Sequence, residues 1–201
     1  MKIPMVDLKQ QYQQLRSEID VEVHKVLESA AYIMGPAVAA LAKDVAAYCD
    51  VKHAIPVASG TDALHLAFRA CGIGRGDEVI TTPFTFIGTC EAISYTGAKP
   101  VFVDIENDSF NIDVSKIEAV ITPRTRAIAP VHLFGQPANL DALMEISHKH
   151  NLRVIEVCAQ SFGASYINIM TGTWGDVGWC SYFASKKLGA SSDAGWVFPT
   201  Y

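Results

Sequence analysis

The fold is decided by the stretch IPVASGTDALHLAFRA, residues 55–70, in which a short apolar run passes through a polar turn into a helical pattern. Ile55–Ala58 has the length and character of a buried strand, and Ala63–Ala70 carries apolar residues at helical spacing. The turn between them, Ser59-Gly60-Thr61, is typical of the start of a helix. A strand followed directly by a helix is the unit from which parallel sheets are built.

The same alternation continues to the end of the chain. Further apolar runs predict six more strands, at Val79–Thr81, Pro100–Val103, Ala127–Val131, Val154–Val157, Val177–Phe183 and Gly195–Phe198. Helical patterns separate several of them, at Phe86–Tyr95, Val114–Val120 and Leu140–His150. Because runs rich in Val and Ile are typical of strands covered on both faces, the sequence predicts an α/β fold. Its sheet has seven strands, is mostly parallel and carries helices on both faces.

Two helical patterns precede this region. Apolar residues between Leu8 and Val26 recur at steps of three and four, which predicts an amphipathic helix, and a second pattern runs from about Val38 to Tyr48. We therefore expect one domain over residues 1–201, with a helical segment over about 1–50 and a sheet region over about 51–201.

Composition excludes several classes of protein. Half of the 201 residues are hydrophobic and 18% are charged, which favours a packed core over disorder. A net charge of −5 without a basic stripe argues against nucleic-acid binding. No apolar run reaches the length of about 20 residues that spans a bilayer, and the first twenty residues lack the apolar stretch of a signal peptide. We expect a cytoplasmic protein with no membrane partner.

Neither cysteine nor histidine spacing predicts a metal site. The five cysteines are scattered without a C-x-x-C pair, which argues against a zinc site or a disulfide framework and fits a reducing compartment. His148-Lys149-His150 has no third ligand nearby and is interpreted as a solvated helix end.

The glycine-rich run Gly72–Asp77 follows a helix and precedes a strand, the reverse of a dinucleotide fingerprint. It predicts a turn, and it is the only support for a nicotinamide-dependent oxidoreductase.

Three segments could contact a ligand. Ser59-Gly60-Thr61 could hold a phosphate with its backbone N–H groups, its hydroxyls and the positive end of the helix, or could be an ordinary helix cap. Phe86 follows a strand and could cover one face of a planar ring, or could be a core residue. Gln160, taken alone, is equally consistent with a polar loop residue.

Lys186 is the candidate for covalent chemistry. It ends the aromatic segment Ser181-Tyr182-Phe183-Ala184-Ser185-Lys186, where burial would lower the pKa of its ammonium and favour the nucleophilic amine. Lys187, beside it, is the alternative. A reactive amine together with an upstream phosphate seat indicates a phosphorylated aldehyde cofactor.

Taken together, these segments resemble the DegT/DnrJ/EryC1/StrS family of sugar aminotransferases, which use pyridoxal 5′-phosphate (PLP). The resemblance covers nearly the whole chain. It is carried, in order, by Val6–Leu8, Ile33–Pro36, Ala58–Leu64, Gly76–Ile80, Pro83–Phe86, Val131–Gln136, Ala159-Gln160 and Ser181–Lys186.

The resemblance implies a role for each candidate residue. Lys186 would be the Schiff-base lysine, and Gly60, Thr61 and Ser181 would bind the cofactor phosphate. Phe86 would stack on the pyridine ring, and Gln160 would lie near its phenolic oxygen. The implied fold is the three-layer large domain of fold-type I PLP enzymes.

The resemblance also implies substrates and partners. Glutamate would donate an amino group to a keto group of a nucleotide-linked sugar, in cell-surface polysaccharide or amino-sugar biosynthesis. The segment Ala159–Ser165 is most similar to members that act on UDP-linked N-acetyl sugars. Family members form homodimers whose sites borrow residues across the interface, so we expect self-association.

Two features depart from the family pattern. The family aspartate that pairs with the protonated pyridine nitrogen is replaced by Val157, and Glu156 points to the other face of its strand. Loss of a charge-assisted hydrogen bond of about 1.5–3 kcal/mol predicts weaker cofactor binding and slow or absent transamination. The chain also ends at Tyr201, without the smaller C-terminal domain that the resemblance implies, and the usual Gly-Asp-Gly-Gly segment is Ser192-Asp193-Ala194-Gly195. The alternative is therefore a catalytically inactive, truncated member that acts as a scaffold or binding protein.

Overall fold

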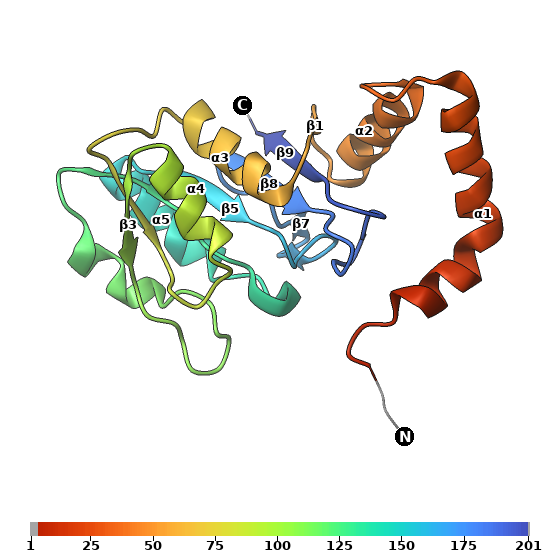
Figure 1. Cartoon of the computed structure of the whole chain (residues 1–201). Coiled ribbons are helices and arrows are strands. Elements are labelled where there is room, and N and C mark those ends of the chain that lie inside the picture. The colour runs from red at the N-terminus through yellow and green to blue at the C-terminus, as the bar shows by residue number, and fades with distance from the viewer. Residues whose placement is uncertain (1–3, 201) are drawn as a thin grey trace.

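The computed structural model describes residues 4–200. Residues 1–3 and 201 of the domain predicted over 1–201 lie outside the described residues. Two helices precede an alternation of strands and helices (Figure 1). The helices are α1 (Leu8–Ser29), α2 (Pro36–Tyr48), α3 (Gly60–Ala70), α4 (Gly88–Tyr95) and α5 (Leu140–His150). The main strands are β1 (Ile55–Val57), β2 (Glu78–Thr81), β3 (Lys99–Phe102), β4 (Thr125–Ile128), β5 (Arg153–Val157), β8 (Val177–Ser181) and β9 (Gly195–Pro199).

These seven strands form one sheet in the order β1-β9-β8-β5-β4-β2-β3. Strand β9 runs antiparallel to both of its neighbours, and the remaining pairs are parallel. The predicted seven-stranded, mostly parallel sheet is confirmed, and each strand lies where an apolar run predicted it. The runs identify the strands because residues buried on both faces leave little room for polar side chains.

Helices cover both faces of the sheet, which gives three layers (Figure 1). Helices α3 and α4 pack on one face, where Leu64 and Phe68 meet Ile155 and Trp179 in one core cluster. On the other face, Leu143 of α5 packs against β4 and β5, and α2 packs against β8 and β9 in a third cluster. The sheet is therefore buried on both sides, as a parallel sheet requires.

The structure differs from the predicted elements in several places. Strand β8 ends at Ser181, two residues short of the predicted Phe183, because its partner β9 begins at Gly195, which pairs with Ser181. Strand β4 ends at Ile128, short of the predicted Val131, because Pro130 has no N–H to continue the ladder. The predicted helical stretch Val114–Val120 consists of two short 3-10 turns, Val114–Lys116 and Glu118–Val120. A small hairpin, β6 (Ser165–Tyr166) with β7 (Ile169–Met170), was not predicted, because strands of two residues leave no periodic signal.

The carboxyl ends of the parallel strands meet at one edge of the sheet. The register places Val157 of β5 opposite Trp179 of β8, and Val131 bridges to Val157 on the other side. The turn Ser59-Gly60 leads into α3 at the same edge, because the backbone of Gly195 in β9 packs against Ser59. Open α/β sheets bind ligands at this edge.

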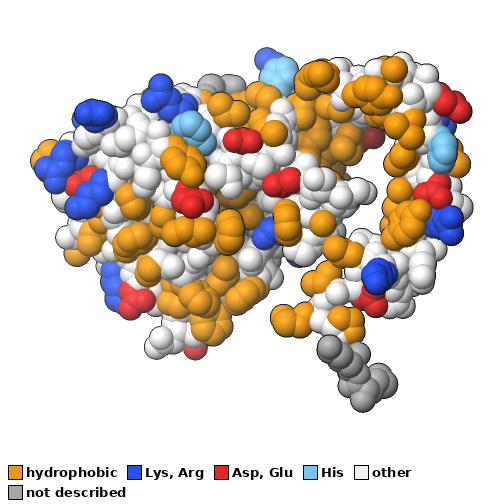
Figure 2. All heavy atoms as spheres, viewed as in Figure 1, with side chains coloured by type: hydrophobic (Ala, Val, Ile, Leu, Met, Phe, Trp, Pro, Cys, Tyr) orange, Lys and Arg blue, Asp and Glu red, His pale blue; other side chains and the backbone are white. Residues whose placement is uncertain are grey.

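Helix α1 projects away from the sheet (Figure 1). None of its 22 residues is buried. Apolar side chains, among them Leu8, Tyr12, Leu15, Val23 and Leu27, are exposed along it. Figure 2 shows hydrophobic side chains gathered on the side of this helix that faces the body. The predicted amphipathic helix is therefore present, and its apolar face has no core to cover it within the described residues. No helix in residues 4–200 is long and apolar enough to cross a membrane.

The core cluster on the α3 face predicts a matched pair of stability effects. Phe68 is fully buried, whereas Phe86 is 73% exposed. Phe68→Ala should lower the free energy of unfolding by about 3–5 kcal/mol because it leaves a cavity. Phe86→Ala, which removes the same atoms, should change it by no more than about 0.5 kcal/mol. Urea denaturation followed by circular dichroism measures both, and equal losses would contradict the assignment of the core.

Candidate active site

A cavity of about 490 Å³ lies at the carboxyl edge of the sheet. All six candidate residues from the sequence line it: Gly60, Thr61, Phe86, Gln160, Ser181 and Lys186. They come from four separate segments of the chain, and Ser181 and Lys186 share the last of them. A larger hollow of about 740 Å³ lies at the opposite edge, near Arg153 and Asp176, but contains none of the candidates. The chemistry-bearing side chains therefore meet in the smaller cavity.

The start of α3 forms one wall. The hydroxyl of Ser59 accepts a hydrogen bond from the N–H of Asp62 at 3.1 Å, so Ser59 is the helix cap. Gly60 and Thr61 follow it and line the cavity. A Cβ on Gly60 would lie 2.7 Å from the Cβ of Ser181, so the helix start and the end of β8 can approach this closely only because residue 60 is glycine. The helix-cap interpretation is therefore confirmed for Ser59, and phosphate binding by Gly60 and Thr61 stays a prediction.

Phe86 lies on the surface beside this wall. A Cβ on Gly88 would lie 3.0 Å from the Phe86 ring and 3.2 Å from the Thr61 hydroxyl, so Phe86 and Thr61 lie on either side of Gly88. Because Phe86 is 73% exposed, the alternative of a core residue is wrong. Its ring is available to a ligand in the cavity.

The structure separates the two neighbouring lysines. Lys186 is half-buried and lines the cavity, and burial lowers the pKa of its ammonium below the ordinary value. Lys187 is exposed, and its amine lies against Gly135, where a Cβ would be 2.9 Å from Nζ. A lowered pKa leaves more free amine near neutral pH. Lys186 is therefore the lysine that can act as a nucleophile on a molecule in the cavity.

Gln160 is held in a fixed orientation. Its Oε1 accepts a hydrogen bond from the N–H of Phe134 at 2.8 Å. With the oxygen engaged, the amide nitrogen is the end that can donate to a ligand. This arrangement favours an oxygen anion as the group that Gln160 meets.

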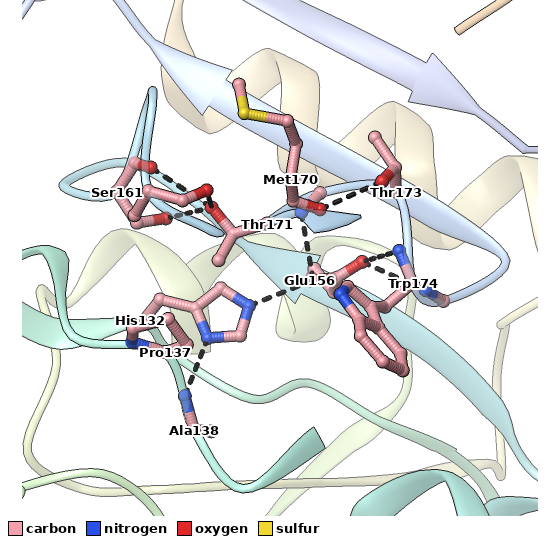
Figure 3. A network of polar contacts seen from close by, with 12 residues as sticks. His132, Pro137, Ala138, Glu156, Ser161, Met170, Thr171, Thr173 and Trp174 are labelled. Atoms are coloured by element: carbon pink, nitrogen blue, oxygen red, sulfur yellow. Dashed lines mark hydrogen bonds and ion pairs between the residues drawn. The ribbon is translucent and has the colours of Figure 1, made fainter. Parts of the chain in front are cut away.

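Glu156 and Val157 divide the two faces of β5. Val157 lines the cavity. Glu156 is fully buried on the other face, where its carboxylate accepts hydrogen bonds from the N–H groups of Gly172, Trp174 and Gly175 at 2.9, 2.7 and 2.9 Å. His132 Nε2 donates a fourth at 3.0 Å (Figure 3). As the sequence predicted, Glu156 does not reach the cavity.

His132, Glu156 and Cys158 lie close enough together to resemble a metal site. However, both ring nitrogens of His132 and the carboxylate of Glu156 already make hydrogen bonds within the protein. His132 Nδ1 accepts from the N–H of Ala138 at 3.1 Å, so its proton is on Nε2 and points to Glu156. Burial raises the pKa of the Cys158 thiol, which disfavours the thiolate that binds metals. The cluster is a satisfied polar network.

Several residues that line the cavity were not among the sequence candidates. His132 and Leu133 follow β4, Thr89 lies in α4, and Asp193 precedes β9. Their position could have been anticipated for His132 from the rule that ligands bind beyond the carboxyl ends of parallel strands. The same rule applies to Leu133, whereas Thr89 lies in a helix and Asp193 in a loop whose path the sequence does not reveal.

A sequence model of the DegT/DnrJ/EryC1/StrS aminotransferase family matches residues 13–200. The chain belongs to this family. Its resemblance to the family, inferred above from ordered motifs, is thereby confirmed. The family's members are aminotransferases, and its solved structures share the fold described here.

Three proteins illustrate the similarity. The UDP-N-acetyl-3-dehydro-alpha-D-glucosamine 3-aminotransferase of Acidithiobacillus ferrooxidans is 50% identical over 97% of this chain and 53% of its own length. A DegT DnrJ EryC1 StrS aminotransferase from Brucella abortus superposes with a TM-score of 0.96 at 37% identity, over 100% of this chain and 56% of that one. NtdA from Bacillus subtilis, with bound cofactor PMP, superposes with a TM-score of 0.94 at 30% identity, over 100% and 45%. The chain spans about half the length of the relatives that it matches.

The Glu156 network predicts a loss of stability when its charge is removed. Glu156→Gln replaces one acceptor oxygen with an NH₂ group that faces backbone N–H donors, and so leaves a buried donor unsatisfied. The free energy of unfolding should fall by about 1–3 kcal/mol. Glu145→Gln, at an exposed position on α5, should change it by no more than about 0.5 kcal/mol. Thermal denaturation of both variants measures the difference, and an unaffected Glu156→Gln protein would mean that the network does not stabilise the fold.

Proposed function

We propose that this chain is a PLP-dependent aminotransferase that transfers an amino group from glutamate to a keto group of a nucleotide-linked sugar. The observation that carries the proposal is the cavity that Lys186 lines together with Gly60, Thr61 and Ser181, the residues that we propose bind the phosphate. Residues 60 and 186 are far apart in the sequence, yet both line this cavity. An aldehyde cofactor with a phosphate tail needs one group to bind its phosphate and another to react with its aldehyde.

The residues fit most of the cofactor. A phosphate suits the N–H groups and positive dipole at the start of α3, together with the hydroxyls of Thr61 and Ser181. The exposed ring of Phe86 can cover a planar heterocycle, and the amide of Gln160 can donate to a phenolic oxygen. When bound, PLP supplies an electron-withdrawing ring and an aldehyde carbon that condenses with amines.

Lys186 has two tasks in this proposal. Its free amine holds the cofactor at the aldehyde carbon until a donor amine displaces it. Released, the same Nζ can accept the proton from the amino-bearing carbon of the substrate and return it elsewhere. Half-burial supports both tasks, because it lowers the pKa of the ammonium.

The substrate class rests on the relatives. The similar enzyme of Acidithiobacillus ferrooxidans is named for a UDP-linked N-acetyl amino sugar, in agreement with the expectation from Ala159–Ser165. We propose the same class of acceptor for this chain, in cell-surface polysaccharide or amino-sugar biosynthesis, in the cytoplasm. Val157 favours the second candidate, a catalytically inactive scaffold with the same fold.

We also propose that the protein is a homodimer and that residues 1–201 form one large domain, with a helical segment over about 1–50 and a sheet region over about 51–201. The support is α1, an amphipathic helix of 22 residues with none of them buried. An isolated helix gains most of its stability from packing of its apolar face. A second copy would supply the surface that the chain itself does not.

The cofactor proposal predicts a covalent adduct on one lysine. Purified protein incubated with PLP should develop visible absorbance, and borohydride should then fix a pyridoxyl group on Lys186, located by peptide mass spectrometry. The yield should rise with pH through a midpoint below the ordinary lysine value of about 10.4, because burial lowers the pKa of this ammonium and only the free amine attacks.

The neighbouring lysine provides the matched control. Lys187→Ala should retain the absorbance and the adduct, whereas Lys186→Ala should lose both. Absorbance that survives in Lys186→Ala, or an adduct on Lys187, would reject the assignment. Bound PLP without amino transfer from glutamate would favour the inactive scaffold.

The dimer proposal predicts that a charge on the apolar face of α1 weakens association. Leu15→Glu should raise the dimer dissociation constant about tenfold or more, because burying a leucine contributes about 1.5–3 kcal/mol. Gln13→Glu adds the same charge nearly opposite on the helix and should have little effect. Sedimentation velocity measures both. Equal dissociation constants for the two variants would exclude this face from the interface.

A further inference from the structure

The cavity is poor in carboxylates. Among the described residues that line it, Asp193 is the only one with an acidic side chain. Its position is near the phosphate seat, because it lies two residues before Gly195, where a Cβ would be 2.5 Å from the carbonyl oxygen of Ser59. Asp193 is also exposed. It is therefore placed at the rim.

Several other acceptors that line the cavity are engaged by the protein itself. His132 Nδ1 accepts from Ala138, and Gln160 Oε1 accepts from Phe134. The hydroxyls of Thr85 and Thr89 pair with each other at 3.0 Å. None of these groups carries a negative charge that would stabilise a cation.

Four large hydrophobic residues make up much of the remaining wall, and the only polar atom among their side chains is the indole N–H of Trp179. Leu64, Val131, Val157 and Trp179 line it, and each is at most 6% exposed. The nearest carboxylate along β5, that of Glu156, lies on the opposite face and already accepts four hydrogen bonds. A rotation of Glu156 into the cavity would leave three buried backbone N–H groups without partners.

The character of this wall determines the protonation state of the cofactor's ring nitrogen. The ring nitrogen of PLP is para to the carbon that carries the aldehyde, so it lies on the far side of the ring from the amine of Lys186. PLP enzymes tune the ring through the group placed at this nitrogen, and an acidic side chain there holds it as a cation. An apolar wall disfavours the cation by desolvation.

We propose that this chain holds PLP with its ring nitrogen unprotonated, against the apolar wall that Val157 forms with Val131, Leu64 and Trp179. The inference rests on the proposed function, because it presupposes that PLP binds in this cavity. It has two consequences. The ring is a weaker electron acceptor than a pyridinium, and the protein makes no use of the nitrogen in binding.

The experiment compares PLP with 1-deazapyridoxal phosphate, in which a C–H group replaces the ring nitrogen. The wild-type protein should bind the two with dissociation constants within about threefold, because no charged hydrogen bond is at stake. Val157→Asp should prefer PLP by about tenfold or more, since it restores such a bond. Titration monitored by absorbance or tryptophan fluorescence gives the ratios.

A second readout reports the protonation of the ring nitrogen directly, in the wild-type protein as well as in the variants. Wild-type protein loaded with PLP labelled with ¹⁵N in the ring should show a nitrogen resonance in the range of unprotonated pyridine. In Val157→Asp the resonance should move toward that of pyridinium. Val157→Thr, which has nearly the shape of valine and no charge, should leave it in place.

The outcomes separate the two proposals. A pyridinium resonance in the wild-type protein would overturn this inference and leave the cofactor site intact. If that resonance were lost in Asp193→Asn, Asp193 would be the group that holds the nitrogen as a cation. If neither PLP nor its analogue binds, the proposed function fails and this inference fails with it.

Discussion

The buried carboxylate of Glu156 is the interaction on which the rest of the site depends. It gathers the N–H groups of Gly172, Trp174 and Gly175 and the ring of His132 around the middle of the sheet (Figure 3). The segment from Gly172 to Gly175 leads directly into β8, and β8 leads to Lys186. Four hydrogen bonds offset the desolvation of the charge and fix where β8 begins relative to β5.

The same interaction constrains the ligand side of the sheet. Successive strand residues point to opposite faces. Because the side chain of Glu156 points to one face of β5, that of its neighbour Val157 points to the other face and lines the cavity. His132 is fixed in turn, because one ring nitrogen donates to Glu156 and the other accepts from Ala138. The network therefore keeps the charge of Glu156 away from the cavity, and the side chain that β5 presents to the cavity beside it is the uncharged Val157.

Close backbone contact completes the site at the other end. Gly60 and Gly195 let the start of α3 approach Ser181 and the end of β1 approach β9. The turn proposed to bind phosphate follows β1 and Lys186 follows β8, the two strands on either side of β9, although more than a hundred residues separate Thr61 from Lys186. A rigid sheet holds both ends of a ligand at a fixed separation, which suits a cofactor that must not move while protons are transferred.

The sequence by itself determined the seven strands, the helices that alternate with them and the family, because apolar runs and ordered motifs are local properties. It also identified the six candidate residues, which the fold then brought to one cavity. Local pattern could not supply the hairpin of residues 165–170, the shortened end of β4 or the 3-10 turns at Val114–Val120. Those depend on proline chemistry and on packing over very few residues. The motif match had already favoured Lys186, and the tertiary structure added that Lys186 but not Lys187 lines the cavity and that Phe86 lies on the surface. Both distinctions are matters of burial, and burial depends on segments that meet only after the sheet has formed.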